Sequence, residues 1–200
     1  MLDIATDAQI ILACEEDPEC FRDLFERHFA PVRAFLARRV GPELAEDLAV
    51  ETFALAFRRR ESYDARRASA LPWLFGIAIN LLRHHRRTER RKLIAYARSG
   101  VDPQPASDPG FEAAESRLEA QAAGPVLALA LAKLRPVERD VLLLYAWADL
   151  TYSEIADALR IPVGTVRSRL SRARKQLREL LAASGQEFDG NTKEKLATDE

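Results

Sequence analysis

Cations mixed with short hydroxyl side chains fill the stretch from residue 160 to residue 178. The stretch holds seven arginine or lysine residues and no acidic residue, although the whole chain has a net charge of −1. Arginine can donate two hydrogen bonds to a guanine edge in the major groove of DNA, and serine or threonine can contact a base or a phosphate. These residue types therefore point to nucleic-acid recognition.

A helical projection of this stretch separates an apolar face from a cationic face. At about 100° per residue, the apolar face collects Val166, Leu170, Ala173 and Leu177. The opposite face holds Arg167, Ser168, Ser171, Arg172, Lys175 and Arg178. We expect Arg169 and Arg174, at the edges, to contact phosphates or neighbouring acids. An arginine-rich face can also be ordinary solvated surface, so the choice between the two interpretations depends on the neighbouring elements.

Two shorter predicted helices precede this cationic helix. Thr151 and Glu154 have the spacing of a capping box, which starts the second helix. A turn at 161–164 follows, after Arg160 at a position where many such turns have glycine. Thr165 is the predicted N-cap of the third helix, whose N-terminus can also face a phosphate. This order is typical of a helix-turn-helix motif, whose second helix enters the major groove.

The first half of the chain predicts further amphipathic helices. Apolar residues recur at three- and four-residue steps over 21–40, ending at Gly41-Pro42, and again over 43–58. Polar residues 60–70 predict a loop. Pro72 then suits the first turn of a long helix, whose apolar start gives way to a basic block at 83–98. Two basic blocks on a nearly neutral chain suggest two contacts with one polyanion.

These patterns predict an all-α protein with two small helical domains joined by a flexible linker. The expected boundaries are 1–98 for the first domain, 99–125 for a linker rich in proline and glycine, 126–183 for the helix-turn-helix domain and 184–200 for a disordered tail. Residues 1–26 hold eight acidic residues and one arginine. This acidic segment could fold against the basic faces.

Other chemistry finds little support in the sequence. There is no apolar run long enough for a membrane span, and the N-terminus lacks the cations of a secretory signal, so we expect a cytoplasmic protein. Cys14 and Cys20 are expected to stay reduced, with a disulfide or redox switch as the alternative. We expect no metal, including at His84-His85, and no cofactor. No nucleophile setting or phosphate-binding loop indicates an enzyme.

Two segments in a fixed order carry a family resemblance. The first is "AEDLAVETFALAF…SYD…PWLFGIAINLLRHHRR" and the second is "LRPVERDVLLLY…LTYSEIADALRIPVGTVRSRLSRARKQLRELL". Together they resemble the extracytoplasmic-function (ECF) sigma factors of the sigma-70 family, over most of residues 20–98 and 126–182. The resemblance implies a factor that binds core RNA polymerase, directs it to promoters and helps to melt them.

The resemblance also implies roles for particular residues. Asp47, Leu48 and Glu51 would dock on the clamp helices of the largest polymerase subunit, although Val50 stands where family members often have glutamine. The loop at 63–71 and Asn80 would meet the minus-ten element and its melted strand. The residues implied to hold phosphates there are Arg83, His84, Arg86, Arg87 and Arg90. The helix-turn-helix would contact the minus-thirty-five element through Thr165, Arg167, Ser168, Ser171, Arg172 and Lys175.

Several alternatives stay open at this stage. From charge alone, Asp47 and Glu51 fit a solvated acidic face as well as a docking face. Trp73 could stack on a base, although its place in an apolar run favours core packing. The chain as a whole could be a stand-alone helix-turn-helix regulator, which would bind duplex DNA tightly without polymerase. An anti-sigma factor is a further partner that the family makes a fair expectation.

Overall fold

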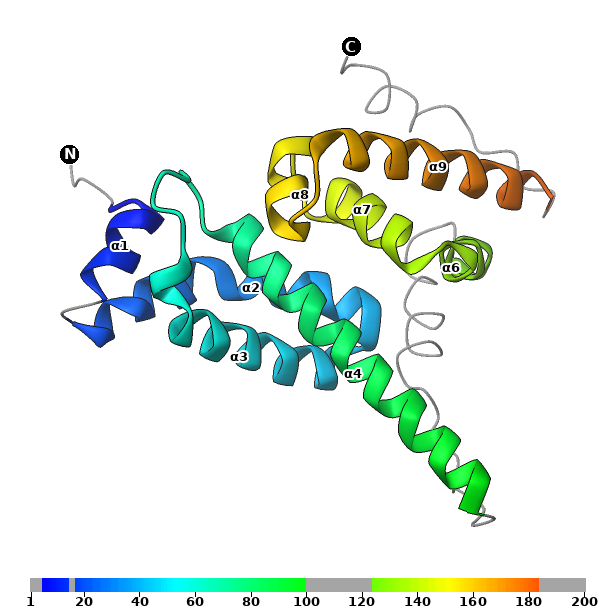
Figure 1. Cartoon of the computed structure of the whole chain (residues 1–200), viewed down its shortest axis with the longest axis horizontal. Helices are drawn as coiled ribbons and strands as arrows, with labels where there is room; N and C mark the ends of the chain where they lie inside the picture. Colours follow the sequence, from blue (N-terminus) through cyan, green and yellow to red (C-terminus); the bar gives the residue numbers. More distant parts are fainter. Residues whose placement is uncertain (1–4, 15–16, 100–123, 184–200) are drawn as a thin grey trace.

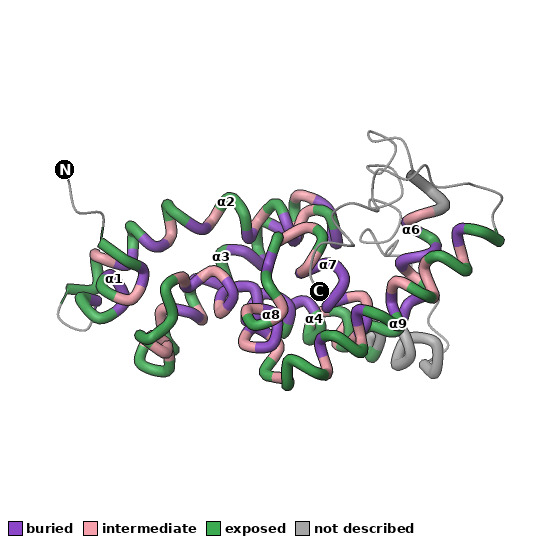
Figure 2. The backbone as a smooth tube through the Cα atoms, turned by 90° about the horizontal axis from the view of Figure 1, so that it is seen from above, coloured by how far each residue is buried: buried purple, intermediate pink, exposed green. Residues whose placement is uncertain are grey.

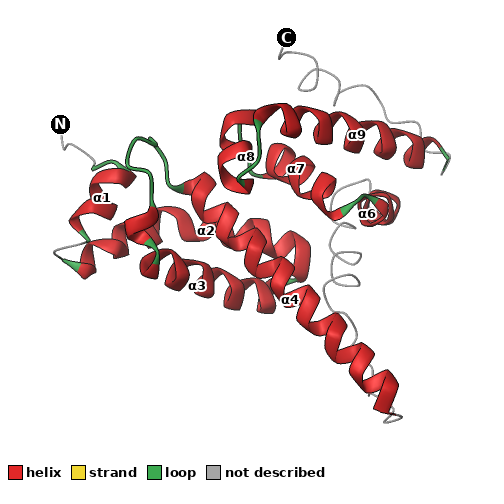
Figure 3. Ribbon diagram, in the orientation of Figure 1, coloured by secondary structure: helices red, strands yellow, loops and turns green. Residues whose placement is uncertain are grey.

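The computed structural model describes residues 5–14, 17–99 and 124–183, and all regular secondary structure within these ranges is helical (Figures 1 and 3). The prediction of an all-α chain is therefore confirmed. The predicted linker at 99–125 lies almost wholly outside the described residues, and the predicted tail at 184–200 lies wholly outside them. No helix in the described part is long and apolar enough to cross a membrane.

The N-terminal domain consists of α1 (Asp7–Ala13), α2 (Phe21–Val40), α3 (Pro42–Arg58) and α4 (Leu71–Ser99), with 3₁₀ turns at Pro18–Cys20 and Arg60–Ser62. Only Gly41 separates α2 from α3. Its φ of 80° lies in the region that favours glycine, and Pro42 takes the first position of α3, where no backbone N–H is needed. The predicted stop at Gly41-Pro42 is confirmed, and it folds α3 directly back onto α2.

Aromatic side chains hold these helices together. The rings of Phe25 on α2 and Phe53 on α3 meet edge to face at 5.0 Å, and Phe35 on α2 meets Phe75 on α4 at the same distance. Each such pair adds about 1 kcal/mol to the gain from burying its apolar area. Buried and exposed residues alternate along each helix (Figure 2), as expected for helices with one face in the core.

A buried carboxylate fixes α1 to the rest of this domain. Asp7 is 4% exposed and accepts hydrogen bonds from Arg27 and His28 on α2, at 2.6 and 2.7 Å. It also accepts one at 2.7 Å from the backbone N–H of Ala70, directly before α4. Burial alone would raise the pKa of Asp7, but these donors outweigh burial and lower its pKa to about 2.

The C-terminal domain consists of α6 (Gly124–Lys133), α7 (Pro136–Trp147), α8 (Tyr152–Leu159) and α9 (Val163–Ala182). Helix α9 packs across α7 and α8. The core of the domain contains Val141, Leu144, Ile155 and Leu170, each no more than 1% exposed. The three predicted helices between residues 136 and 181 are confirmed.

The two domains are packed against each other. Helix α4 of the N-terminal domain lies along α8 of the C-terminal domain, and the two helices are neighbours in both views (Figures 1 and 2). Gly76 on α4 makes this possible, because a side chain there would overlap the backbone carbonyl of Ala158 on α8. The sequence did not predict this contact between domains.

Replacing Asp7 with asparagine should destabilise the N-terminal domain. Because its pKa falls from 3.8 to about 2 on folding, the ionised carboxylate contributes roughly 2 kcal/mol above pH 4, and this contribution is lost as the pH falls towards 2. Urea unfolding of the full chain should therefore give a large difference between Asp7→Asn and the unsubstituted protein at pH 7 and a small one near pH 2.5. The exposed Asp23→Asn is the control; an equal effect there would contradict the prediction.

Candidate nucleic-acid interface

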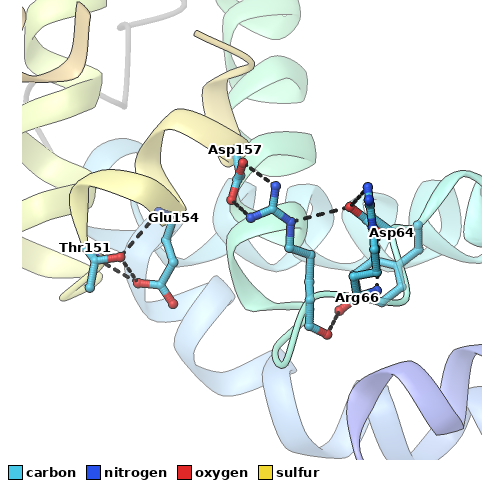
Figure 4. Close-up of polar contacts among 7 residues, drawn as sticks. Asp64, Arg66, Thr151, Glu154 and Asp157 are labelled. Carbon is cyan, nitrogen blue, oxygen red and sulfur yellow. Dashed lines mark hydrogen bonds and ion pairs between the residues drawn. The ribbon is translucent and has the colours of Figure 1, made fainter. Parts of the chain in front are cut away.

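A capping box begins α8, as predicted. The Thr151 hydroxyl accepts a hydrogen bond from the Glu154 N–H at 3.3 Å, and the Glu154 carboxylate accepts one from the Thr151 N–H at 2.8 Å (Figure 4). Both backbone donors are satisfied locally, so the start of α8 does not depend on contacts elsewhere.

The turn between α8 and α9 places a non-glycine residue in a left-handed conformation. Arg160 has φ 53° and ψ 50°, and it ends α8 at the position where glycine is favoured. The Ile161 N–H bonds back to the Ala156 carbonyl at 3.0 Å. The turn therefore has the backbone conformation that glycine usually adopts at the end of a helix, although the residue is Arg160.

The prediction that Thr165 is the N-cap of α9 is wrong. Helix α9 begins at Val163, and Pro162, with φ −60° and ψ 146°, takes the N-cap position without a side-chain cap. The Thr165 and Val166 N–H groups bond to the Pro162 carbonyl at 2.8 and 3.1 Å. Thr165 thus lies in the first turn of α9, half-buried, and not at its end.

The two faces of α9 agree with the projection. Val166, Leu170 and Ala173 are at most 1% exposed, and Leu177 is half-buried against the same core. The exposed residues on the outer side include all the predicted contacts except Thr165, namely Arg167, Ser168, Ser171, Arg172 and Lys175. The burial of the apolar stripe thus forces the cations and hydroxyls to the surface together.

Two arginines of α9 have partners within the domain. Arg172 lies 3.5 Å from the carboxylate of Glu138, a residue only 3% exposed on α7, and 3.5 Å from the Ser168 hydroxyl. The Arg174 guanidinium lies over the Tyr145 ring, 4.9 Å from its centroid, with two of its nitrogens buried. We expected Arg174 on phosphates or neighbouring acids, and in this structure its side chain packs onto an aromatic ring.

The second candidate site lies on α4. Asn80 is exposed directly after the buried segment 74–79, and Arg83, His84, Arg86 and Arg87 are exposed beyond it. The side chain of Arg90 lies outside the described residues. Two of these cations have contacts between elements: Arg83 bonds to Asp140 on α7, and Arg86 bonds to the Arg39 carbonyl at 3.2 Å. The remaining amide and imidazole groups are accessible from solvent.

The loop before α4 is held by its own polar groups. Tyr63 donates to the Arg67 carbonyl at 3.0 Å, and Asp64 pairs with Arg66 (Figure 4). Arg67 bonds across the domain boundary to Asp157 on α8, at 2.7 Å between Nη2 and Oδ1. The ring of half-buried Trp73 lies 5.3 Å from that of Tyr63, which is the packing role that the sequence favoured.

The outer face of α3 is acidic with an apolar centre. Asp47 and Glu51 are exposed, and Val50 between them is 51% exposed. Leu48 is 4% exposed in the domain core, so its side chain supports α3 from inside and does not line this face. The family resemblance implied Leu48 as a docking residue, whereas the phase of the helix exposes Val50 on this face.

Two further residues of the site region were missed. Asp140 is 1% exposed and Arg39 is 5% exposed, and they bond to each other at 2.5 Å between the two domains. A signal existed for both, since each occupies a position on the apolar stripe of its helix. Asp140 lies three residues after Val137 and four before Leu144, and Arg39 lies four after Phe35.

The two cysteines are free thiols. Cys14 is buried and Cys20 is half-buried, and burial raises the pKa of both. Raised pKa values leave little thiolate at neutral pH, so neither side chain has the character of a reactive cysteine. The expectation that both cysteines stay reduced remains a prediction.

Comparison with known proteins identifies both halves of the chain. A family model for sigma-70 region 2 matches residues 24–92, and a model for sigma-70 region 4 matches residues 126–177. The RNA polymerase sigma factor CarQ of Myxococcus xanthus is 35% identical over 164 residues, which cover 82% of this chain and 90% of CarQ. The ECF RNA polymerase sigma factor RpoE of Cereibacter sphaeroides is 30% identical, covering 82% and 87%.

Solved structures share the fold along most of the chain. CnrH in complex with the cytosolic domain of CnrY is 28% identical, has a TM-score of 0.59, and covers 88% of this chain and 99% of that one. The sigma factor RpoE of Bartonella quintana, in complex with the anti-sigma factor NepR, has a TM-score of 0.60 at 24% identity, covering 82% and 98%. The second likeness concerns the fold alone.

Replacing Arg160 with glycine should stabilise the C-terminal domain. The left-handed conformation costs a non-glycine residue about 1 kcal/mol, which glycine avoids. Thermal unfolding should therefore show a higher melting temperature for Arg160→Gly. The matched control is Arg178→Gly on the exposed side of α9, where glycine in a helix interior should lower stability by about 1 kcal/mol. Equal shifts for the two variants would refute this account of the turn.

Proposed function

Because the chain belongs to the ECF sigma factors of the sigma-70 family, which direct RNA polymerase to promoters, we propose that its two domains divide promoter recognition. In this proposal residues 1–98 bind core polymerase and the minus-ten element, and residues 126–183 bind the minus-thirty-five element. The segment 99–125 links the two domains, and residues 184–200 form a tail. The chain acts on polymerase in the cytoplasm as an initiation factor and not as an enzyme.

Helix α9 carries the proposed recognition of the upstream element. The single observation behind it is the two-faced helix, with its apolar stripe at most 1% exposed from Val166 to Ala173 and cations and serines on the outside. A helix of this width fits the major groove, where Arg167 and Arg172 can donate to guanine and Ser168 and Ser171 can contact bases or phosphates. Thr165, in the first turn, lies near the helix N-terminus, which favours a phosphate.

Helix α4 and the preceding loop carry the proposed recognition of the minus-ten element. Extruding a base from the duplex costs a few kcal/mol, so the melted strand needs compensating contacts. The exposed amide of Asn80 can pair with a base edge, and Arg83, His84, Arg86, Arg87 and Arg90 can hold the phosphates of the melted strand. The loop at 63–71 would receive the extruded base.

Protein partners follow from the remaining surfaces. The outer face of α3, with Asp47, Val50 and Glu51, is the proposed docking face for the clamp helices of the largest polymerase subunit. The exposed Val50 supports this over a merely solvated acidic face, because it places an apolar contact between two charges. CnrH was solved in complex with the cytosolic domain of CnrY. Because the family resemblance makes an anti-sigma factor a fair expectation, we propose one as a partner here too.

Run-off transcription with purified core polymerase on promoter fragments tests this function. We expect new start sites that depend on the protein. The alternative, a stand-alone helix-turn-helix regulator, predicts no new start sites and tight binding to duplex DNA without polymerase. That second outcome would overturn the proposed function.

Arg172→Ala should weaken use of the upstream element. If Arg172 contacts a base, its loss costs about 1–3 kcal/mol and relaxes sequence preference at one position. Run-off assays on promoters substituted at each position of the upstream element measure this. The comparison variant is Arg178→Ala, about 1.7 turns further along α9, which should act through phosphates and weaken all sequences alike. If both variants lost activity equally at every substituted position of the upstream element, Arg172 would not contact a base.

Asn80→Ala should impair promoter opening. If the amide holds a melted base, the variant should be slow on double-stranded templates and improve on a template whose minus-ten region is already unpaired. Permanganate footprinting of the opened region gives the measurement. An effect on the pre-melted template alone would show that Asn80 has a different role.

A further inference from the structure

The loop at 63–71, which the proposed function assigns to the minus-ten element, has a tip that closes on itself. The Tyr63 hydroxyl donates to the Arg67 carbonyl at 3.0 Å, and the Arg67 N–H donates to the Asp64 carbonyl at 2.9 Å. Residues 65–68 of the tip are exposed. These bonds fix the shape of the tip. They join residues of the loop only to one another, so they do not fix where the loop lies on the domain.

The position of the loop depends on contacts with distant segments of the chain. At its buried end, Ala70 is 0% exposed, and its backbone N–H donates to Asp7 Oδ2 at 2.7 Å. At its tip, Arg67 pairs with Asp157, but Arg67 is 48% exposed and solvent screens this pair. A buried hydrogen bond to a carboxylate is stronger, and a buried N–H without an acceptor is costly. The bond between Asp7 and Ala70 is therefore the stronger of the two contacts.

The carboxylate of Asp7 is itself held in place by α2. Its Oδ1 accepts a hydrogen bond from Arg27 at 2.6 Å, and its Oδ2 lies 2.7 Å from His28 Nε2. The carboxylate also acts on the first residue of the loop, because burial and then the charges of Asp7 and Asp64 raise the pKa of Tyr63 to about 12. One side chain of α1 thus connects α2 to the loop.

The placement of the loop matters because the loop is proposed to receive the extruded base. A site distinguishes one base from another only if its hydrogen-bonding groups are held close to the productive geometry, and sites on loops are less precise than sites on helices. A loop that can shift would accept several bases. Asp7 is 4% exposed, so it does not touch the base and can act only through the loop.

We propose that Asp7 is a positioning residue for promoter specificity, and that its bond to the Ala70 N–H holds the loop at 63–71 where it can discriminate the extruded base. The proposal rests on the proposed function. Asp7 precedes residue 24, where the match to sigma-70 region 2 begins. The proposal also differs from the expectation that the acidic N-terminus covers the basic faces, because Asp7, the buried acid of that segment, bonds within its own domain.

Asp7→Asn tests this bond with almost no change in side-chain volume. The amide has one acceptor oxygen where the carboxylate has two, and Arg27, as the charged donor, competes best for it. The NH2 group then faces the Ala70 N–H, which loses its acceptor. Thr6→Ala is a milder second variant. Thr6 is exposed and accepts from the Gln9 N–H at 3.3 Å, so its loss loosens α1 without a change in the core.

Phe25→Leu is the matched control for loss of stability. The Phe25 ring packs against those of Phe29 on α2 and Phe53 on α3. The substitution therefore weakens the core of the same domain and changes no group that bonds to Asp7 or to the loop. Urea unfolding gives the loss of stability in each variant, and the comparisons are made at a temperature where circular dichroism shows full helix content.

Hydrogen exchange of the free full chain, followed by mass spectrometry, measures the placement of the loop. Peptides that cover residues 63–71 should exchange roughly tenfold faster in Asp7→Asn, because local opening there loses a buried bond, and by a smaller factor in Thr6→Ala. Phe25→Leu should raise exchange across the domain and not selectively in the loop. Unchanged protection of residues 63–71 in both Asp7→Asn and Thr6→Ala would overturn the proposal.

Base discrimination measures the role in specificity. Polymerase assembled with each variant is bound to pre-melted promoters that carry each base in turn at every minus-ten position. For Asp7→Asn, the binding ratio between the preferred base and the others should fall by roughly tenfold at the position that the loop contacts, which is the discrimination of one good base contact. Ratios at the upstream element should not change. An unfolded fraction lowers binding to all promoters alike, so Phe25→Leu should keep every ratio.

Faster exchange in the loop with unchanged base ratios would overturn the role of Asp7 in specificity. The exchange measurement needs neither polymerase nor promoter. If the unsubstituted chain showed no base preference on any promoter while the exchange of residues 63–71 still rose in Asp7→Asn, the result would count against the proposed function and not against the bond that places the loop.

Discussion

Every element of this protein depends on burying one apolar stripe per helix. Helices of 8 to 20 residues, such as α8 and α9, are marginal in water unless tertiary packing supports them. The same packing fixes which residues remain outside. On α9 the stripe ending at Ala173 directs the arginines and serines outwards, and on α4 the buried segment 74–79 leaves Asn80 as the first exposed residue. The candidate DNA contacts are thus a consequence of core formation.

This dependence explains which features the sequence predicts. Helical spacing within one element identified α2, α3, α4 and the faces of α9, and local capping chemistry identified the start of α8. Both signals lie within a few residues of the feature they predict. The phase of the stripe also carried information that the prediction missed, because it makes Leu48 internal and Val50 external.

The errors have a different origin. Thr165 was a reasonable N-cap by residue type, but the extended conformation of Pro162 lets α9 begin three residues earlier. Arg174 is a cation at the edge of a face, and only the position of Tyr145 on another helix decides that it stacks on a ring. The contact between α4 and α8 joins segments about 80 residues apart, and no local pattern carries that pairing.

Two buried carboxylates, Asp7 and Asp140, show how similar ion pairs can give contacts of different stability. Asp7 has three donors from one domain, and all of them satisfy it, so its pKa falls and the joint is stable above pH 4. Asp140 joins two domains and faces more guanidinium groups than it can neutralise, leaving buried nitrogens of Arg39 and Arg139 unpaired. An interface with uncompensated buried charge is less stable than one in which every charge is paired.

In the proposed function, DNA binding is strongest when both contacts form together. Each domain alone offers a small surface, and linking two weak contacts raises their combined affinity only if the spacing between them matches the DNA. The proposed contacts of Asn80 on α4 and of Arg167 on α9 lie on different domains. Promoter selection in this proposal therefore depends on what sets the separation of the two domains, and core polymerase is the partner proposed to set it.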